Sequence, residues 1–319
     1  MTPQKIEPCP VTLGVDRVTG CPLWVRLLAG ITRQMPRGRY VAMHNVPENA
    51  PPFWMRLDWG GWFICDLKDI ICREVCFTGK YEPQETAIVD QLLKPGMTFV
   101  DVGANWGYFS LLAAHKVGPG GRVISLEPDP RIFSSLSANI ARNAMRRIAA
   151  LPVAAADARS MLTLAGYDDR HWNRGVSTIA TGRPSAGATF AVQAVRLDEL
   201  LDEQGIDRVD VLKMDIEGAE DLALTGMTAG LREQRYRKVL LEVHPADLAL
   251  RGRTSKDVLH LLSGAGYRAF RIDDSNDATR KACYSRRPEA RAYLSPVRQL
   301  KTTDDRSHFL WLARGEREL

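Results

Sequence analysis

Two glycines and two polar side chains follow the first buried strand that the sequence predicts. The strand ends in Asp101, and Gly103, Asn105 and Gly107 come directly after it. Glycines at this spacing allow a tight strand-to-helix turn in which the backbone lies close to a ligand. The turn is not the GxGxxG turn of dinucleotide-binding folds, and an acid before the first glycine suits a cationic ligand group better than a pyrophosphate. The pattern therefore predicts a loop that binds a ligand carrying an ammonium group.

Acidic residues after the next two predicted strands extend this site. Glu127 follows the second strand, 26 residues after Asp101. In nucleoside-binding α/β folds an acid at this place binds the ribose hydroxyls. Asp157 follows the third strand, where an acid can contact the amino group of an adenine. Strands often end in solvated acids, and this alternative stays open, above all for Asp157.

Four more polar side chains follow the fourth and fifth predicted strands. Asp215 ends the fourth strand, and Glu217 lies near the start of the next helix, where a carboxylate also satisfies the helix dipole. Glu242 and His244 end the fifth strand and point to one face, because side chains alternate along a strand. A histidine there can take a proton from a hydroxyl nucleophile. We predict this role for His244, with Asp215 or Glu242 orienting it.

A metal site is the second interpretation of these strand ends. Carboxylate and imidazole ligands suit several divalent ions, and Asp215, Glu242 and His244 provide both. We do not predict that the protein needs a metal, because one histidine at a strand end more often shapes a site than ligates an ion.

The elements that position these residues alternate between strand and helix over about 220 residues. This pattern predicts an α/β fold with a doubly wound, mostly parallel sheet of seven strands and helices on both faces. Such sheets bind ligands at the carboxyl ends of their strands, near a switch in strand order. A loop that contains Trp172 is expected between the third and fourth strands. The predicted strands are 97–102, 122–126, 151–155, 209–214, 238–243, 267–272 and 309–313, and the predicted helices are 83–94, 111–117, 130–145, 197–204, 219–231 and 255–262.

Residues 1–80 differ from the rest of the chain in composition and in their less regular pattern of predicted elements. They contain clustered prolines and the three tryptophans Trp54, Trp59 and Trp62. Two strands around Gly60-Gly61 and a helix at 69–78 predict a small α+β extension, which we expect to act as a substrate lid or as a dimer contact. Residues 81–319 are expected to form the ligand-binding domain.

The composition limits the class of protein. The chain has 319 residues, of which 45% are hydrophobic and 25% charged, which excludes a disordered chain or a coiled coil. No apolar run reaches the roughly 18–20 residues of a membrane-spanning helix. The formal charge of +5 lies entirely in residues 280–319, which hold ten Lys and Arg against five acids. Without a CxxC pair or a secretory signal, the sequence predicts a reducing, cytoplasmic location.

The ordered set of motifs resembles the FkbM family of S-adenosylmethionine-dependent methyltransferases, over about residues 70–250. The resemblance implies methylation of a hydroxyl on a sugar, a glycan or a natural-product intermediate, with S-adenosylmethionine as the cofactor. The matching segments are 79–85, 95–108, Glu127-Pro128 with Leu136, Asn139 and Asn143 behind it, 197–201, 210–220 and 241–244.

The resemblance also implies roles for individual residues. Asp101, Gly103, Ala104, Asn105 and Gly107 form the cofactor loop, Glu127 holds the ribose, and Asp157 contacts the adenine. Tyr81 and Glu82 close over the methionine end, and Asp215, Glu217, Glu242 and His244 flank the site of methyl transfer.

The expected partner is a small-molecule or glycan acceptor with a free hydroxyl, and the chain is a candidate homodimer. Nucleic acid is disfavoured because the first 279 residues carry no net charge, although the basic segment at 280–319 leaves it open. Two other functions stay open: a methyltransferase that acts on RNA or protein, and a non-catalytic S-adenosylmethionine-binding protein.

Overall fold

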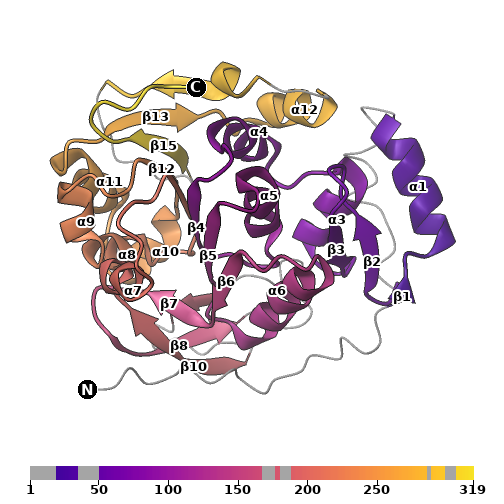
Figure 1. Cartoon of the computed structure of the whole chain (residues 1–319), viewed down its shortest axis with the longest axis horizontal. Helices are drawn as coiled ribbons and strands as arrows, with labels where there is room; N and C mark the ends of the chain where they lie inside the picture. Colours follow the sequence, from indigo (N-terminus) through magenta and orange to yellow (C-terminus); the bar gives the residue numbers. More distant parts are fainter. Residues whose placement is uncertain (1–18, 35–49, 167–176, 180–187, 286–288, 299–306) are drawn as a thin grey trace.

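An eight-stranded sheet forms the centre of the protein (Figure 1). The computed structural model describes residues 19–34, 50–166, 177–179, 188–285, 289–298 and 307–319. The strand order is β14-β13-β15-β12-β11-β4-β5-β6. The bounds are β4 (Thr98–Val102), β5 (Arg122–Leu126), β6 (Ile148–Leu151), β11 (Val211–Met214), β12 (Lys238–Val243), β13 (Arg268–Ile272), β14 (Leu294–Pro296) and β15 (Ser307–Leu312).

The sheet is mostly parallel and changes direction at β4. Strands β4, β5 and β6 follow one another outward, and the chain then returns to place β11 and β12 on the other side of β4. Strand β15 is antiparallel to both β12 and β13, and β14 adds an eighth strand at the edge. The predicted fold class is confirmed, and the carboxyl ends of β4 and β11 lie at the switch point where such sheets bind ligands.

Helices cover both faces of the sheet. Neighbouring residues of a strand pack into different cores: Phe99 lies in one buried cluster and Val100 in the other. Helices α4, α5 and α12 lie on one side and α8, α9 and α11 on the other (Figure 1). The bounds are α4 (Pro83–Leu92), α5 (Tyr108–Val117), α6 (Pro130–Arg142), α7 (Leu197–Glu203), α8 (Glu220–Thr225), α9 (Thr228–Arg232), α10 (Pro245–Leu250), α11 (Ser255–Gly264), α12 (Asn276–Tyr284) and the 3₁₀ helix η2 (Ala290–Tyr293). In the described ranges, no helix combines the length and the apolar character needed to cross a membrane.

The N-terminal extension shares a core with the main sheet. It contains β1 (Thr19–Gly20), α1 (Leu23–Gln34), β2 (Phe53–Arg56), β3 (Trp62–Cys65) and α3 (Ile70–Thr78). The predicted hairpin around Gly60-Gly61 is present, since β2 and β3 are antiparallel. Phe63 and Phe77 pack in the same buried cluster as Phe99 of β4.

Two asparagines of α6 join the extension to the rest of the protein. Asn139 accepts a hydrogen bond from the Ile64 amide at 2.8 Å, and Asn143 accepts one from the Trp62 amide at 2.7 Å. Because they are four residues apart, both lie on one face of the helix. Asn139 also donates to the Trp106 carbonyl at 2.8 Å. These contacts hold β3 and the turn after β4 against α6.

The prediction of the third strand was wrong in its bounds. The main sheet takes β6 (Ile148–Leu151), whereas β7 (Val153–Ala155) joins a separate four-stranded sheet of order β7-β10-β8-β9. Pro152 lies between the two strands and has no amide hydrogen with which to continue a ladder. The other strands of this second sheet, where a loop was expected, are β8 (Ser160–Gly166), β9 (Ser177–Ile179) and β10 (Thr189–Val195), while Trp172 lies outside the described residues.

A buried carboxylate of α7 holds α9 and Tyr236 in place and predicts a stability effect. Asp198 accepts hydrogen bonds from the Tyr236 hydroxyl at 2.6 Å and from the Gly230 amide at 3.0 Å. We expect Asp198→Ala to lower the free energy of unfolding by about 2–4 kcal/mol, because two buried donors lose their acceptor. Urea unfolding measures this loss. Glu199→Ala, an exposed change in the same helix, is the control, and an equal effect of both variants would contradict the expectation.

Candidate active site

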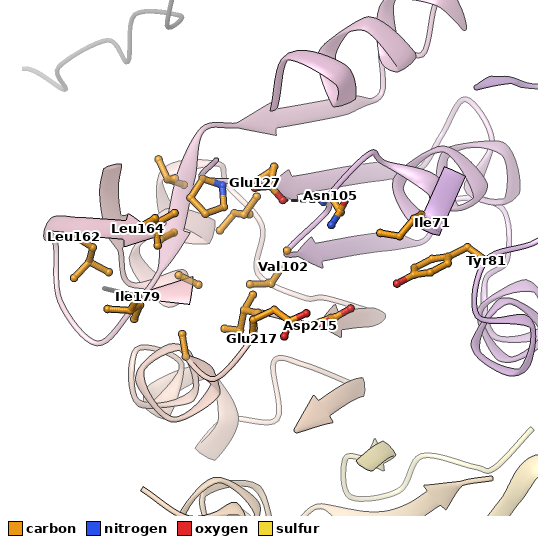
Figure 2. A pocket seen from close by; sticks show the side chains of 18 residues that line it. Ile71, Tyr81, Val102, Asn105, Glu127, Leu162, Leu164, Ile179, Asp215 and Glu217 are labelled. Atoms are coloured by element: carbon orange, nitrogen blue, oxygen red, sulfur yellow. Dashed lines mark hydrogen bonds between the residues drawn. The ribbon is translucent and has the colours of Figure 1, made fainter. Parts of the chain in front are cut away.

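A pocket lies at the carboxyl ends of β4, β5 and β11, where the strand order switches. Figure 2 shows Leu162, Leu164 and Ile179 at one end of the pocket and Tyr81 at the other. Polar side chains lie between these ends, namely those of Asn105, Glu127, Asp215 and Glu217. The pocket therefore offers an apolar compartment followed by a strongly acidic one.

The glycine-containing turn forms the floor of the pocket. Gly103 has φ 83°, and a Cβ placed on it would lie 1.9 Å from the Asp215 carbonyl oxygen. Gly107 has φ 86° and begins α5, and its Cβ would lie 2.4 Å from Leu136 Cδ1. Asn105 has the left-handed φ of 52° that asparagine tolerates better than most residues. Only glycine fits at 103 and 107, as the tight turn requires.

Glu127 supports this turn from the neighbouring strand. Its Oε2 accepts a hydrogen bond from the Asn105 amide and its Oε1 accepts one from the Asp129 amide, both at 2.9 Å. Burial raises the pKa of Glu127 to about 8. Each oxygen has a second lone pair, so the side chain can also bind the hydroxyls of a ligand in the pocket.

Asp101 lies behind the turn and does not line the pocket. Its carboxylate accepts a hydrogen bond from the Ser110 hydroxyl at 2.5 Å, and Ser110 contacts the Ser125 hydroxyl at 2.7 Å. Burial raises the pKa of Asp101 to about 6. The side chain thus connects β4, β5 and α5 beneath the turn, a role for which the sequence gives no signal in the two serines.

Lys213 is a central cation that the sequence analysis did not identify as functional. Its ammonium lies 3.2 Å from Asp215, 3.3 Å from Glu82 and 3.6 Å from Glu85, and the side chain is buried. Burial alone would raise the pKa of Glu85, but Lys213 and His308 outweigh it and lower that pKa to about 2. Lys213 therefore fixes carboxylates from α4 and β11 beside the end of the pocket that holds Tyr81.

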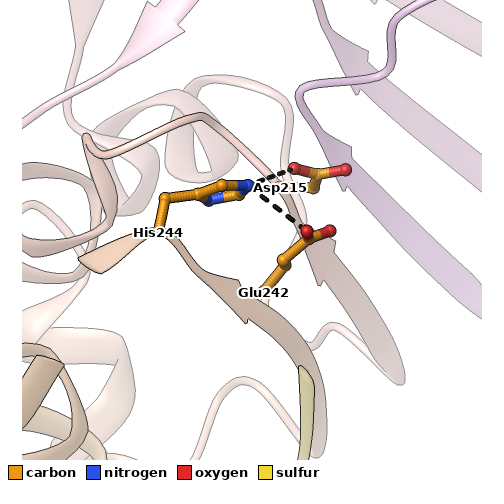
Figure 3. Close-up of side chains that lie close together, drawn as sticks. All are labelled: Asp215, Glu242 and His244. Atoms are coloured by element: carbon orange, nitrogen blue, oxygen red, sulfur yellow. Dashed lines mark ion pairs between the residues drawn. The ribbon is translucent and has the colours of Figure 1, made fainter. Parts of the chain in front are cut away.

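His244 lies among four carboxylates at the end of β12, and Figure 3 shows two of them, Asp215 and Glu242. Its Nδ1 is 2.7 Å from Glu220 Oε1. Its Nε2 is 3.3 Å from Glu242 Oε1, 3.4 Å from Glu217 Oε2 and 3.7 Å from Asp215 Oδ1. Burial disfavours the charged ring, but the hydrogen bond with Glu220 and the nearby carboxylates of Glu242 and Glu217 raise the pKa of His244 well above 6.5. A raised pKa makes the ring a stronger base, and the ring takes up a proton in its neutral form.

Two further side chains, His308 and Glu220, contact this cluster, and His308 does so through strand pairing. His308 lies opposite Glu242 because β15 pairs antiparallel with β12, and its Nδ1 is 2.6 Å from Glu85 Oε1. Burial lowers the pKa of His308, but Glu242 and Glu85 raise it to about 9. Glu220, the first residue of α8, holds His244. The antiparallel last strand is not readable from local pattern, so the sequence gives no direct signal for His308.

The structure brings most of the predicted site residues together and leaves three apart. Asp101 lies behind the turn, Gly107 begins α5, and Asp157 is exposed and outside the pocket lining. The predicted residues that line the pocket, its small adjoining cavity or the cluster around His244 and Lys213 are Tyr81, Glu82, Gly103, Ala104, Asn105, Glu127, Asp215, Glu217, Glu242 and His244.

Comparisons with known proteins identify the family of the chain. The methyltransferase FkbM domain matches residues 101–269, more than half of the chain. The 31-O-demethyl-FK506 methyltransferase FkbM of Streptomyces tacrolimicus is 31% identical over 199 residues, which are 55% of this chain and 74% of that protein. The hexuronic acid methyltransferase AglP of Haloferax volcanii is 27% identical over 165 residues, 52% of this chain and 61% of that protein. A solved structure of a putative rRNA-methylase from Clostridium thermocellum is 10% identical, with a TM-score of 0.42 over 72% of this chain and 93% of that chain. The chain therefore belongs to the FkbM family of methyltransferases.

Proposed function

We propose that the protein transfers a methyl group from S-adenosylmethionine to a hydroxyl group of a sugar or natural-product intermediate. The observation that carries this proposal is the order of side chains along the pocket. An apolar end is followed by the buried carboxylate of Glu127, and then by the carboxylates of Asp215 and Glu217 beside His244.

This order matches the three parts of the donor. An adenine suits the apolar wall of Leu162, Leu164 and Ile179, which β8 and β9 provide instead of Asp157. The ribose hydroxyls suit Glu127, whose carboxylate has free lone pairs. The cationic sulfonium and amino groups suit the acidic end of the pocket, because opposite charges attract strongly where water is partly excluded.

In the reaction, the protein holds the methyl donor and the acceptor in line and removes the proton of the acceptor hydroxyl. S-adenosylmethionine supplies an activated methyl group, which moves from sulfur to the acceptor oxygen as the carbon–sulfur electron pair stays on sulfur. Pocket walls that hold both reactants in line supply a proximity effect. The hydroxyl proton goes to the cluster of Asp215, Glu242 and His244, which borders the pocket through Asp215.

The names of two relatives support a hydroxyl acceptor. One methylates 31-O-demethyl-FK506, whose name places the methyl group on an oxygen, and the other a hexuronic acid, which carries hydroxyl groups beside its carboxyl group. We place the reaction in the cytoplasm, because the five cysteines in the described residues are thiols and not disulfides.

We further propose that the N-terminal extension forms part of the acceptor site. Ile71 of α3 lines the pocket, so the extension reaches the place where an acceptor must lie. A second hollow in the extension contains Trp54, Trp62 and Arg142, and the guanidinium of Arg142 lies 5.6 and 5.0 Å from the two ring centres. Aromatic faces beside a cation suit a sugar that carries a negative charge. Trp59, by contrast, stacks on His115 and serves packing.

Incubation with S-adenosylmethionine labelled at its methyl carbon tests the proposed function. The acceptors are a uronic acid, a neutral hexose, a hydroxylated macrolide, ribosomal RNA and ribosomal protein. We expect the label in an O-methyl ether of one of the first three, with one S-adenosylhomocysteine formed per methyl group. Label only on RNA, on protein or on nitrogen would overturn the proposal.

Glu127→Gln is expected to weaken the binding of S-adenosylhomocysteine by roughly 10–100-fold, because glutamine has one oxygen where Glu127 has two, and a buried polar group that loses its hydrogen-bond partner costs about 1–3 kcal/mol. Glutamine keeps one of the two acceptors that the Asn105 and Asp129 amides use, so the turn keeps part of its support. Calorimetric titration measures the affinity. Asp157→Asn is the control and should bind like the wild type, since Asp157 lies outside the pocket. The assignment fails if Glu127→Gln binds as tightly as the wild type.

A further inference from the structure

Three side chains beside the pocket have the separations of a metal-ligand set. Asp215, Glu242 and His244 each offer one ligand atom, and all three atoms lie within 4.8 Å of one another. His244 Nε2 is 3.3 Å from Glu242 Oε1 and 3.7 Å from Asp215 Oδ1 (Figure 3). Around an ion held at about 2.1 Å, adjacent ligand atoms lie about 3 Å apart and opposite ones about 4.2 Å apart. Shifts of a few tenths of an ångström would therefore enclose a cation.

The imidazole of His244 is oriented as a metal ligand would be. Its Nδ1 lies 2.7 Å from Glu220 Oε1, and a carboxylate can only accept, so Nδ1 carries the hydrogen. The remaining lone pair is then on Nε2, which faces the two carboxylates. Metal-binding histidines nearly always donate their second nitrogen to such a partner, which fixes the ring and its tautomer.

Nε2 of His244 supplies an independent observation. The side chain is only 3% exposed, and this nitrogen makes no hydrogen bond within the described part of the chain. A buried polar atom without a hydrogen bond costs about 1–3 kcal/mol and calls for an explanation. A cation bound between Nε2 and the carboxylates would satisfy it.

The carboxylates are also held in place from outside. Lys213 contacts Asp215 through Oδ2 at 3.2 Å, which leaves Oδ1 facing His244. His308 lies opposite Glu242 in the sheet, with Nε2 3.6 Å from Glu242 Oε1. Outer contacts of this kind orient the ligands of metal sites.

The local charge favours a further cation. Among the described residues, six carboxyl groups surround two histidines and a single ammonium, that of Lys213, and burial together with Glu85 raises the pKa of Glu82 well above its usual range. Buried charges are stable only when they are compensated. The six are Glu82, Glu85, Asp215, Glu217, Glu220 and Glu242.

We propose that Asp215, Glu242 and His244 bind a divalent transition-metal ion at the edge of the pocket. Two carboxylates and one imidazole suit Mn²⁺, Fe²⁺ or Zn²⁺ better than Mg²⁺ or Ca²⁺, which prefer oxygen ligands alone. If the proposed function holds, on which this second step rests, the ion binds the acceptor hydroxyl and lowers its pKa.

Binding of Mn²⁺ to chelator-treated full-length protein tests the site. Electron paramagnetic resonance of free Mn²⁺ should show one bound ion per chain. Glu242→Gln and Asp215→Asn should each weaken this binding at least tenfold, and Glu220→Gln should weaken it by about 10–100-fold through the orientation of His244. Asp277→Asn, which removes an exposed acid on α12, is the control and should bind like the wild type.

Calorimetric binding of S-adenosylhomocysteine, measured on the wild type, Glu242→Gln, Glu220→Gln and Asp277→Asn, shows that the fold and the donor pocket are intact. Asp215 lines that pocket, so urea unfolding checks the fold of Asp215→Asn. The metal proposal is overturned if the wild type binds no Mn²⁺, or if the two ligand variants bind it as well as Asp277→Asn does. In either case bound S-adenosylhomocysteine leaves the methyltransferase proposal standing. Conversely, one-site Mn²⁺ binding without methyl transfer to any acceptor would contradict the proposed function and not the metal site.

Discussion

His244→Ala is expected to lower the turnover of methyl transfer by roughly 10²–10⁴-fold and to leave the affinity for S-adenosylhomocysteine unchanged. His244 does not line the donor pocket, but its Nε2 lies within 3.7 Å of three carboxylates at the edge of that pocket. Removing the ring takes away the group around which these carboxylates are arranged. Whether the ring accepts the hydroxyl proton or ligates the proposed cation, it acts on the acceptor hydroxyl, so the loss falls on the chemical step.

Steady-state kinetics with an acceptor from the panel, together with calorimetry, separates these effects. We expect kcat to fall while the dissociation constant for S-adenosylhomocysteine stays at the wild-type value. His260→Ala is the matched control, because this histidine is exposed on α11 and should leave both quantities unchanged. A His244→Ala protein with wild-type kcat would remove the cluster from the mechanism.

Gly103→Ala is expected to weaken the binding of S-adenosylhomocysteine by ~100-fold or more and to destabilise the protein. Its φ of 83° costs an alanine about 1–2 kcal/mol. In addition, the new Cβ would lie 1.9 Å from the Asp215 carbonyl oxygen. The turn and the end of β11 must then move apart, and together they form the floor and the acidic wall of the pocket.

Gly252→Ala separates the two causes. Gly252 has φ 69° and no atom within 4 Å of its added Cβ, so an alanine there destabilises the protein through backbone strain alone. We expect that control to lose about 1–2 kcal/mol in urea unfolding and to bind S-adenosylhomocysteine normally. If Gly103→Ala behaved no differently from Gly252→Ala, the close approach of turn and strand would not matter for binding.

Local pattern predicts the main sheet well because its strands are short buried runs that alternate with amphipathic helices. It predicts no strands between residues 156 and 196, where β8 and β10 form most of a second sheet. Strand β8 is largely exposed, and its partner β10 lies more than 20 residues further along the chain. Such pairing is set by tertiary contacts that a local window does not contain.

Local sequence pattern likewise predicts only those site residues that lie at the ends of the parallel strands. Asp215, Glu242 and His244 are predicted because parallel strands bring their carboxyl ends to one edge of a sheet. Glu85 and His308 join them only through a helix that packs on the sheet and a strand that inserts antiparallel beside β12. Neither contact is encoded in the spacing of nearby residues.

The adenine end of the pocket depends on the second sheet. The sequence predicts Asp157 there, but this residue is exposed and lies outside the pocket lining. Leu162, Leu164 and Ile179 line that end instead, because β8 and β9 fold over it. An acid-based adenine contact therefore stays a prediction, whereas the apolar wall follows from the fold.

A crystal structure with S-adenosylhomocysteine tests the central claim most directly. We expect the adenine to pack against Leu164 and Ile179, and the ribose hydroxyls to lie about 2.5–3.2 Å from the carboxyl oxygens of Glu127. We also expect the sulfur at the acidic end of the pocket, beside Asp215. S-adenosylhomocysteine bound elsewhere, or in the reverse direction with its adenine beside Asp215, would contradict the account.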